Sequence, residues 1–475
     1  MVFSSLTFIY LFLPAVLALH YASRSHAWRN GVLTAASLFF YAWGEPVWVI
    51  LLLFSAAVDY FHGRLAESAR GTWKAKAAVA SSLVLNLGLL GAFKYSGFVT
   101  GNLNALLGLS LPVPEFNLPI GISFYTFQTI SYTIDCYRGH AKAQKSFGKF
   151  LLYVSLFPQL VAGPIVRYVD IARDVESRRF DWDVFASGAG RFALGLAKKV
   201  ALANAAGAAA VPFLDADPAG LPVLGAWYGI MLFAFQIYFD FSGYSDMAIG
   251  LGRMFGFSFK ENFAHPYVSR SATEFWRRWH MSLGSFFRDY LYIPLGGNRR
   301  RAIFNIIVVW ALTGLWHGAS WNFVVWGLYW GALIAMEKAV SRVTRLKAPA
   351  PLGHAYLLVA ALVGWVLFHH VDLGRGLSYL SAMFAFGTRP LSSPALELAA
   401  TGKLFLVAFA ALASTPLPAR LLERLGVSTE ASPSRGRPDK AGRSVLAPVF
   451  DIGLVLLSTA LLAGQSYNPF LYFRF

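Results

Sequence analysis

The sequence predicts an all-α, polytopic membrane protein, and three observations support this fold class. Hydrophobic residues make up 56% and charged residues only 14% of the 475-residue chain, whose mean hydropathy is +0.52. Apolar stretches that suit a ~30 Å hydrocarbon core recur along the chain, separated by short clusters of lysine and arginine. Glycine and proline interrupt some of these stretches, which indicates re-entrant and interfacial helices beside about eleven or twelve transmembrane helices.

We expect one integral-membrane domain over residues 1–475, with N-terminal helices at about 1–135, a central core at about 136–340 and C-terminal helices at about 341–475. The formal net charge is +17, but the basic residues lie between apolar spans as they do in cytoplasmic loops, so nucleic-acid binding is not expected. Cys136 is the only cysteine, which excludes an intramolecular disulfide and a cysteine-based metal cluster.

The N-terminal part reads as a series of spans that begins with an uncleaved helix. Val2–Leu19 is apolar and its positive charges, Arg24 and Arg29, follow it, which places the N-terminus outside. Further spans are expected at Val32–Ala42, Val47–Tyr60, Ala78–Phe93 and Leu118–Ile134.

The central part begins with a segment whose two ends both look cytoplasmic. Phe150–Val166 contains two proline-bearing motifs and no charge, so we expect a re-entrant segment buried in protein. Arg167–Arg179 is expected to form a cytoplasmic or interfacial helix. Ala201–Phe213 then crosses outward and Leu221–Phe239 returns inward.

A polar run follows Phe239 and admits two interpretations. Either Asp or Ser caps a new helix that starts at Met247, or the run lines a substrate tunnel, and both readings can hold together. The side chains expected to line such a tunnel are Asp240, Ser242, Tyr244 and Asp246.

Residues 260–301 are rich in arginine, tryptophan and polar side chains. An interfacial helix with a basic face explains this composition. A site for a phosphate-bearing acyl donor explains it as well, because arginine forks onto phosphates and tryptophan stacks on flat rings. The candidate donor-binding residues are Trp276, Arg277, Arg278, Arg288 and Asn298.

An uncharged run of about 35 residues lies between Arg301 and Glu337 and predicts two helices folded back on each other. Basic residues flank both ends, which places both on the cytoplasmic side and sends His317 into the membrane near the bend. An ionisable group at that depth is a functional candidate. The alternative is a structural, hydrogen-bonded histidine. Asn322, in the same run, is a candidate substrate contact.

The C-terminal third is simpler. Spans are expected at Ala355–Phe368, Leu404–Leu412 and Val449–Leu462, with a hydrophilic cytoplasmic loop at Arg420–Arg443 and the C-terminus outside. His369 and His370 form half of a metal site without carboxylate or thiol ligands at suitable spacing, so no metal is expected.

Several motifs together resemble the membrane-bound O-acyltransferase (MBOAT) family, most closely its bacterial branch that includes the membrane subunit of alginate O-acetylation. The resemblance covers essentially the whole chain. The motifs are Gly121-Ile122-Ser123-Phe124-Tyr125, Phe157-Pro158-Gln159, Tyr238-Phe239-Asp240-Phe241-Ser242-Gly243-Tyr244, Glu274-Phe275-Trp276-Arg277-Arg278-Trp279-His280, Leu295-Gly296-Gly297-Asn298-Arg299 and Gly314-Leu315-Trp316-His317-Gly318.

The resemblance implies a ring of tilted helices around a thinned centre, with a funnel from each side meeting at a histidine. It implies that His317 is catalytic and that His280 is the second essential polar residue. It also implies no bound cofactor, a cytoplasmic acetyl thioester such as acetyl-CoA as donor, and a separate periplasmic SGNH-type acetyltransferase as partner, in the lipids of a bacterial inner membrane.

The acceptor implied by this branch is an exopolysaccharide such as alginate. Peptidoglycan, cellulose or another envelope polymer is the alternative, and D-alanyl transfer to teichoic acid agrees less well with Leu295-Gly296-Gly297-Asn298-Arg299. Two non-enzymatic functions are also compatible with the sequence. A transporter also places polar residues at mid-membrane, although no paired half-repeat is visible, and an envelope-assembly scaffold would tolerate the loss of His317.

Overall fold

The structure is a computed structural model that describes residues 1–160, 163–344, 349–425, 427, 446–465 and 467–471. Helices dominate these ranges, and their only β pairing is an isolated bridge between Phe386 and Arg389. The chain divides into two compact units. The first unit comprises Met1–Phe192 and Ser245–Lys260, and the second comprises Ala193–Tyr244 and Glu261–Phe475.

The helices of the first unit include three that pack around a buried carboxylate. Asp59 on α3 accepts hydrogen bonds from Ser82 and Asn86 on α4 and from Thr133 on α6. The helices are η1 (Phe8–Phe12), α1 (Leu13–Tyr21), α2 (His26–Gly44), α3 (Val49–Ser68), α4 (Trp73–Leu90), η2 (Gly91–Tyr95), α5 (Ser96–Leu107), α6 (Ile122–Arg138), α7 (Phe147–Ser155), α8 (Phe157–Leu160), α9 (Tyr168–Glu176) and most of α10 (Trp182–Ala197).

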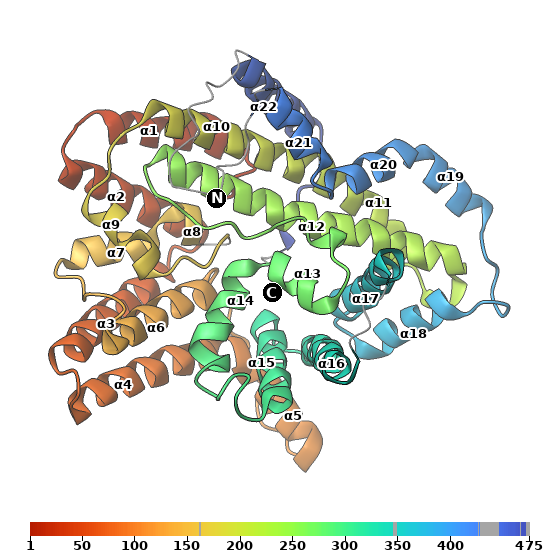
Figure 1. Ribbon diagram of the computed structural model, residues 1–475, viewed down its shortest axis with the longest axis horizontal. Helices are drawn as coiled ribbons and strands as arrows, with labels where there is room; N and C mark the ends of the chain where they lie inside the picture. Colours follow the sequence, from red (N-terminus) through yellow and green to blue (C-terminus); the bar gives the residue numbers. More distant parts are fainter. Residues whose placement is uncertain (161–162, 345–348, 426, 428–445, 466, 472–475) are drawn as a thin grey trace. The chain divides into compact units, whose positions relative to one another are not determined.

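The second unit holds the remaining helices, and the long helix α12 has residues 223–244 in the second unit and residues 245–254 in the first. They are η3 (Lys198–Ala203), α11 (Asn204–Leu214), η4 (Pro218–Gly220), α12 (Val223–Met254), η5 (Pro266–Val268), α13 (Ala272–Arg278), α14 (Met281–Phe287), η6 (Arg288–Tyr292), α15 (Ala302–His317), α16 (Trp321–Val343), α17 (Ala350–His369), α18 (Leu373–Phe384), α19 (Pro394–Gly402), α20 (Leu404–Ala413), α21 (Leu417–Arg424) and α22 (Leu446–Gly464). Figure 1 follows the order of these helices along the chain.

Seven helices in the described ranges are long and apolar enough to cross a membrane, or eight if the bent pair α19 and α20 counts as one span. The polytopic, all-α fold class is thereby confirmed. The number is lower than the predicted eleven or twelve, for two reasons. Apolar segments such as α15 are too short to be counted. The 17-residue helix α6 is also too short, and it buries Ser, Thr and Gln side chains along its length, which lowers its hydropathy. The buried polar face of α6 packs against protein and needs no lipid.

The predicted re-entrant segment is a broken, buried helix. α7 ends at Ser155, Leu156 has extended ψ, and α8 starts at Phe157. Every residue of 150–160 is buried, and residues 161–162 lie outside the described ranges. Irregular backbone inside protein agrees with the sequence interpretation, while its depth in the membrane stays a prediction.

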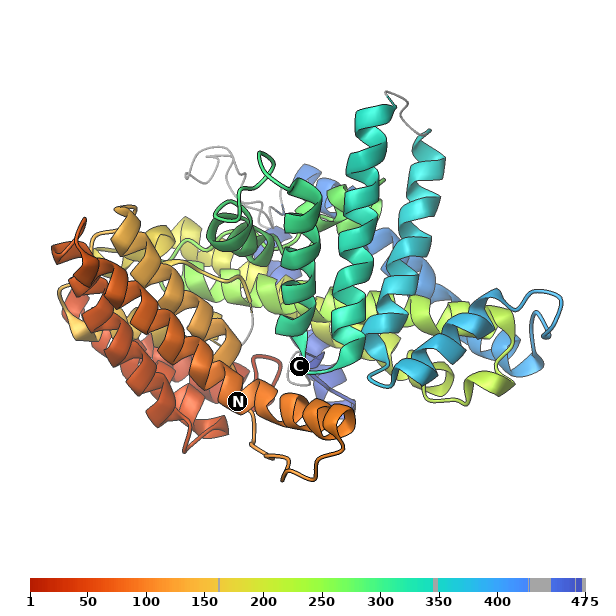
Figure 2. The same ribbon diagram turned by 90° about the horizontal axis from the view of Figure 1, so that it is seen from below.

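The hairpin predicted between Arg301 and Glu337 is present as α15 and α16, which lie side by side in both views (Figures 1 and 2). Two glycines allow the close approach of these helices. A Cβ atom at Gly314 would meet the Phe323 carbonyl oxygen at 2.1 Å, and one at Gly327 would meet the Trp310 carbonyl oxygen at 2.2 Å. Small residues at a helix crossing let the backbones touch, as is common in membrane proteins.

The predicted helix start at Met247 is wrong, because α12 runs without interruption from Val223 to Met254. Its two carboxylates are neutralised where they lie. Asp240 pairs with Lys199 at 2.7 Å and Asp246 pairs with Arg191 at 2.6 Å, all four side chains being buried. Paired charges can be buried in mid-helix, so these carboxylates do not act as caps.

Candidate functional site

His317 is the last residue of α15, at the bend of the hairpin where the sequence places it. Its ring is buried among aromatic side chains. The centroid distances are 4.9 Å to Trp326, 5.3 Å to Phe368 and 4.8 Å to Trp316. A Cβ atom at Gly318 would meet the Phe323 ring at 2.2 Å, so the turn after His317 requires glycine. The hairpin thus holds one imidazole in an aromatic cage.

Asn322 fixes one wall of this cage. Its side-chain amide donates to the carbonyl oxygens of Leu367 at 3.2 Å and Phe368 at 3.4 Å, at the end of α17. The start of α16 is therefore joined to the residue whose ring contacts His317. Asn322 was predicted to contact substrate. In the structure its side chain instead bonds the protein backbone and positions α16 against α17.

His280 lies between α13 and α14, with φ of 46°, a left-handed conformation that is uncommon for residues other than glycine. Its Nδ1 lies 3.1 Å from the Asn262 Oδ1, an atom that also accepts from the Ser282 hydroxyl at 2.8 Å. Because an amide oxygen only accepts, this contact favours the tautomer with the proton on Nδ1 and the lone pair on Nε2. Burial lowers the pKa of His280 to about 3, so the ring is neutral at physiological pH.

Trp316 connects the two histidines. The His280 centroid is 6.0 Å from that of Trp316, which adjoins His317 in sequence and in space. The centroid of the His280 ring also lies 4.7 Å from that of Phe241 on α12. The second unit thus brings both predicted catalytic residues against one indole.

Trp276, predicted to stack on a donor, belongs to an aromatic cluster within the protein. Its centroid lies 4.6 Å from Trp310, 5.5 Å from Trp326 and 5.3 Å from Trp330. Trp326 also contacts His317. Trp276 therefore couples α13, which precedes His280, to the hairpin that carries His317.

The predicted donor-binding arginines lie near the surface. Arg278 pairs with Glu274 at 2.9 Å, Arg288 pairs with its neighbour Asp289 at 2.7 Å, and Arg277 is exposed. Exposed ion pairs of this kind contribute little to stability. Both guanidinium groups can therefore exchange their carboxylate partner for a phosphate. Asn298 is exposed and accepts hydrogen bonds from Tyr292 and Lys338.

The four predicted tunnel residues of α12 are all buried. Asp240 also accepts the backbone N–H of Leu471 at 2.9 Å, and the Tyr244 ring lies 4.7 Å from Phe470. Two of these side chains thus hold the C-terminal part of the chain. Asp246 forms an ion pair with Arg191. Ser242, which lies between Asp240 and Asp246 in the sequence, is also buried.

Sequence reasoning missed two positioning residues, Asn262 and Glu337. Glu337 of α16 accepts the backbone N–H groups of Ala272 and Thr273 at 2.6 and 2.9 Å, and so caps α13 from another helix. Glu337 is the first charged residue after a long uncharged run, and this position could have marked it as functionally or structurally important. Asn262 is fully buried, but a single Asn after Lys260 and Glu261 carries no pattern.

Comparison with known proteins identifies the family of the chain and several relatives. The model of the membrane-bound O-acyltransferase family matches residues 121–378, which include both histidines. The chain is 38% identical to the probable alginate O-acetylase AlgI of Azotobacter vinelandii and 37% identical to that of Pseudomonas aeruginosa, each over 100% of both chains. It is 33% identical to the peptidoglycan O-acetyltransferase of Helicobacter pylori, over 81% of this chain and 80% of that protein. The chain is thus a membrane-embedded acyltransferase that belongs to the membrane-bound O-acyltransferase family.

Proposed function

We propose that this protein takes acetyl from a cytoplasmic thioester and passes it across the bacterial inner membrane for O-acetylation of an exopolysaccharide such as alginate. The names of the full-length relatives support acetyl as the group and alginate as the acceptor. The basic clusters between apolar spans support donor entry from the cytoplasmic side.

The position of His317 supports acyl transfer most directly. It ends α15 at the bend of a hairpin whose two helices contain no charge between Arg301 and Glu337. The aromatic cage around the ring excludes bulk water from the reacting groups. An acyl group that reaches this ring is protected from hydrolysis.

Two reaction sequences use the unprotonated nitrogen of His317. As general base, it removes the proton of an acceptor hydroxyl while the oxygen attacks the thioester carbon; the C–S bond breaks and the thiolate takes a proton. As nucleophile, it forms an N–acyl bond while the thiol leaves, and the hydroxyl then takes the acyl group from the ring. Both end with one ester and one free thiol.

His280 is proposed as the second polar residue of the reaction. Its Nδ1–H is directed to Asn262, so Nε2 is an acceptor. A neutral ring in this tautomer can accept a hydrogen bond from a hydroxyl, but it cannot donate from Nε2 to a thioester oxygen. We therefore assign His280 to orienting a hydroxyl or the His317 ring, and not to stabilising an oxyanion.

Acetyl-CoA is the proposed donor, held at its phosphates by Arg277, Arg278 and Arg288. No bound cofactor is proposed. The partner is proposed to be a periplasmic SGNH-type acetyltransferase subunit, which receives the acetyl group and transfers it to polysaccharide hydroxyls.

The test uses inverted inner-membrane vesicles that contain the full chain and its partner subunit, with acetyl-labelled acetyl-CoA added outside. His317→Gln is expected to lower label in polymer esters by at least about a thousandfold, as for loss of a nucleophile or its base. His354→Gln is the matched control, because His354 is a half-buried histidine on α17 with one hydrogen bond, to the Ser269 carbonyl oxygen. Equal activity of the two variants would refute the role of His317.

Peptidoglycan is the second candidate acceptor, which the Helicobacter pylori relative favours. NMR of acetyl esters on isolated exopolysaccharide and isolated peptidoglycan, from cells with and without the protein, separates the two. Loss of acetyl from peptidoglycan alone would replace the first acceptor with the second.

A further inference from the structure

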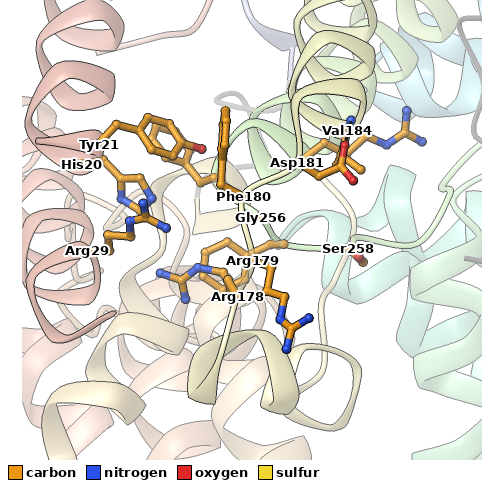
Figure 3. Close-up of a pocket in the computed structure, with 13 residues that line it drawn as sticks. His20, Tyr21, Arg29, Arg178, Arg179, Phe180, Asp181, Val184, Gly256 and Ser258 are labelled. Atoms are coloured by element: carbon orange, nitrogen blue, oxygen red, sulfur yellow. Dashed lines mark hydrogen bonds between the residues drawn. The ribbon is translucent and has the colours of Figure 1, made fainter. Parts of the chain in front are cut away.

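A basic cavity lies in the first unit, outside the site described above. It has a volume of about 170 Å³ (Figure 3). Its lining comes from α1, α2, the segment between α9 and α10, the start of α10, and the end of α12 with the four residues 255–258. A water molecule occupies about 30 Å³ in the liquid, so the cavity admits a group much larger than one water. It accommodates a phosphate with part of its substituent.

Four arginines line this cavity, Arg29, Arg178, Arg179 and Arg253, against one carboxylate, that of Asp181. The Asp181 carboxylate accepts the backbone N–H groups of Asp183 and Val184 at the start of α10. Within the described ranges, the structure shows no ion pair between a carboxylate and Arg29, Arg178 or Arg179. Arginine side chains therefore outnumber carboxylates in the lining of the cavity, which gives it an excess of positive charge.

Two buried polar atoms at the cavity lack a hydrogen-bond partner among the described residues. They are Nδ1 of His20, a residue only 1% exposed, and Nε of Arg178. The other Arg178 nitrogens donate to the Asp174 carbonyl and the Asn30 amide oxygen, both at 2.7 Å. Those bonds fix the guanidinium over the Phe257 ring at 4.3 Å. Buried polar groups are almost always satisfied in folded proteins, so an acceptor from outside the chain is indicated.

The surroundings of the cavity are those of a membrane interface. α1 is apolar and ends at Tyr21, and the exposed residues near its end include Leu19 at 54% and Trp28 at 47%. Trp182, which opens α10, is 74% exposed and contacts Phe180 of the cavity at 4.7 Å. Exposed tryptophans beside the end of an apolar helix mark the headgroup level.

We propose that this cavity binds the phosphate headgroup of an anionic phospholipid from the cytoplasmic leaflet. The phosphodiester accepts hydrogen bonds from Arg178 and Arg179, and the acyl chains run along the exposed apolar face of α1. Basic pockets beside transmembrane helices bind anionic headgroups in this way. The exposed apolar rim favours a lipid over a free phosphate. The site is separate from the proposed acyl transfer and does not depend on it.

The test is native mass spectrometry of the full chain in detergent, with phosphatidylglycerol or phosphatidylcholine of the same acyl chains added at equal concentration. Arg179→Gln is the main variant, because Arg179 is exposed and its loss leaves the fold intact. Phosphatidylglycerol binding is expected to fall about fivefold, which corresponds to one arginine near an anionic headgroup. Arg178→Gln is expected to cause a larger loss, provided that its melting temperature shows a folded protein.

Arg173→Gln is the matched control, because Arg173 is exposed on the nearby α9 but does not line the cavity. It should leave phosphatidylglycerol binding unchanged. The proposal is overturned if phosphatidylcholine binds equally well, or if Arg179→Gln behaves as Arg173→Gln does. It is also overturned if millimolar inorganic phosphate displaces the lipid, since the cavity would then be a site for soluble phosphate.

Discussion

At the scale of single residues, the local backbone and the hydrogen-bond partners determine what His317 and His280 can do. His317 could be placed from the sequence, because the charge pattern around an uncharged run fixes where the bend must lie. The tautomer of His280 could not. It depends on Asn262, which is distant in sequence, and on a left-handed backbone at a position occupied by histidine.

The burial of His280 predicts a pH dependence of stability. Its pKa is about 3 in the folded protein, against about 6.5 when solvated, so between these values only the unfolded chain binds the extra proton. Stability therefore falls as pH drops below 6.5, by about 2 kcal/mol at pH 5 from this residue. His280→Gln removes this term, so the decrease in melting temperature from pH 7 to pH 5 should be smaller than in the wild type. If His280→Gln and His354→Gln show the same decrease as the wild type, the neutral, buried state of His280 is disproved.

At the scale of elements, the hairpin and the capped helix α13 form the frame of the site. The hairpin was predictable, because hydropathy and flanking charge are local properties of the sequence. The continuity of α12 was not, because its carboxylates are neutralised by Lys199 and Arg191 from other segments. A carboxylate that looks like a helix cap in the sequence can thus belong to a buried ion pair in mid-helix.

The glycines of the hairpin give a direct test of its packing. Gly314→Ala places a methyl group against the Phe323 backbone at 2.1 Å, which cannot move without shifting α16. We expect a loss of about 1–3 kcal/mol in stability, as for other overpacked sites, together with lower acyl transfer. Gly453→Ala on α22 is the control, since nothing lies within 4 Å of its added Cβ. A normal melting temperature for Gly314→Ala would contradict the close helix crossing.

At the scale of the whole molecule, composition and charge pattern suffice to predict a polytopic membrane protein, and the motifs suffice to predict its family. Pattern alone does not fix the number of membrane spans, because helices such as α6 bury polar side chains along their length. Nor does it show that Asp240 and Lys199 link α12 and η3 to residues 469–471 near the C-terminus. Lys199 pairs with Asp240 and donates to the Pro469 carbonyl, while Asp240 accepts from Leu471.

This buried pair predicts a non-additive effect on stability. Lys199→Met alone leaves the Asp240 carboxylate buried without its cation, which costs about 3–5 kcal/mol. Adding Asp240→Asn removes the stranded charge and keeps an oxygen for the Leu471 N–H, so the double variant should be more stable than Lys199→Met. Thermal unfolding of the two single variants and the double variant in detergent measures this. Additive losses would mean that the two side chains do not interact.

Transfer of the acyl group at His317 can be measured directly in proteoliposomes. They contain the reconstituted full chain with its partner subunit, and a polysaccharide acceptor is enclosed inside. Acetyl-CoA that carries one label on the acetyl group and another on the coenzyme A part is added outside. We expect acetyl esters inside and coenzyme A only outside, with the esters lost in His317→Gln but not in His354→Gln. Coenzyme A inside together with acetyl, or esters formed equally by His317→Gln, would contradict transfer of the acyl group at His317.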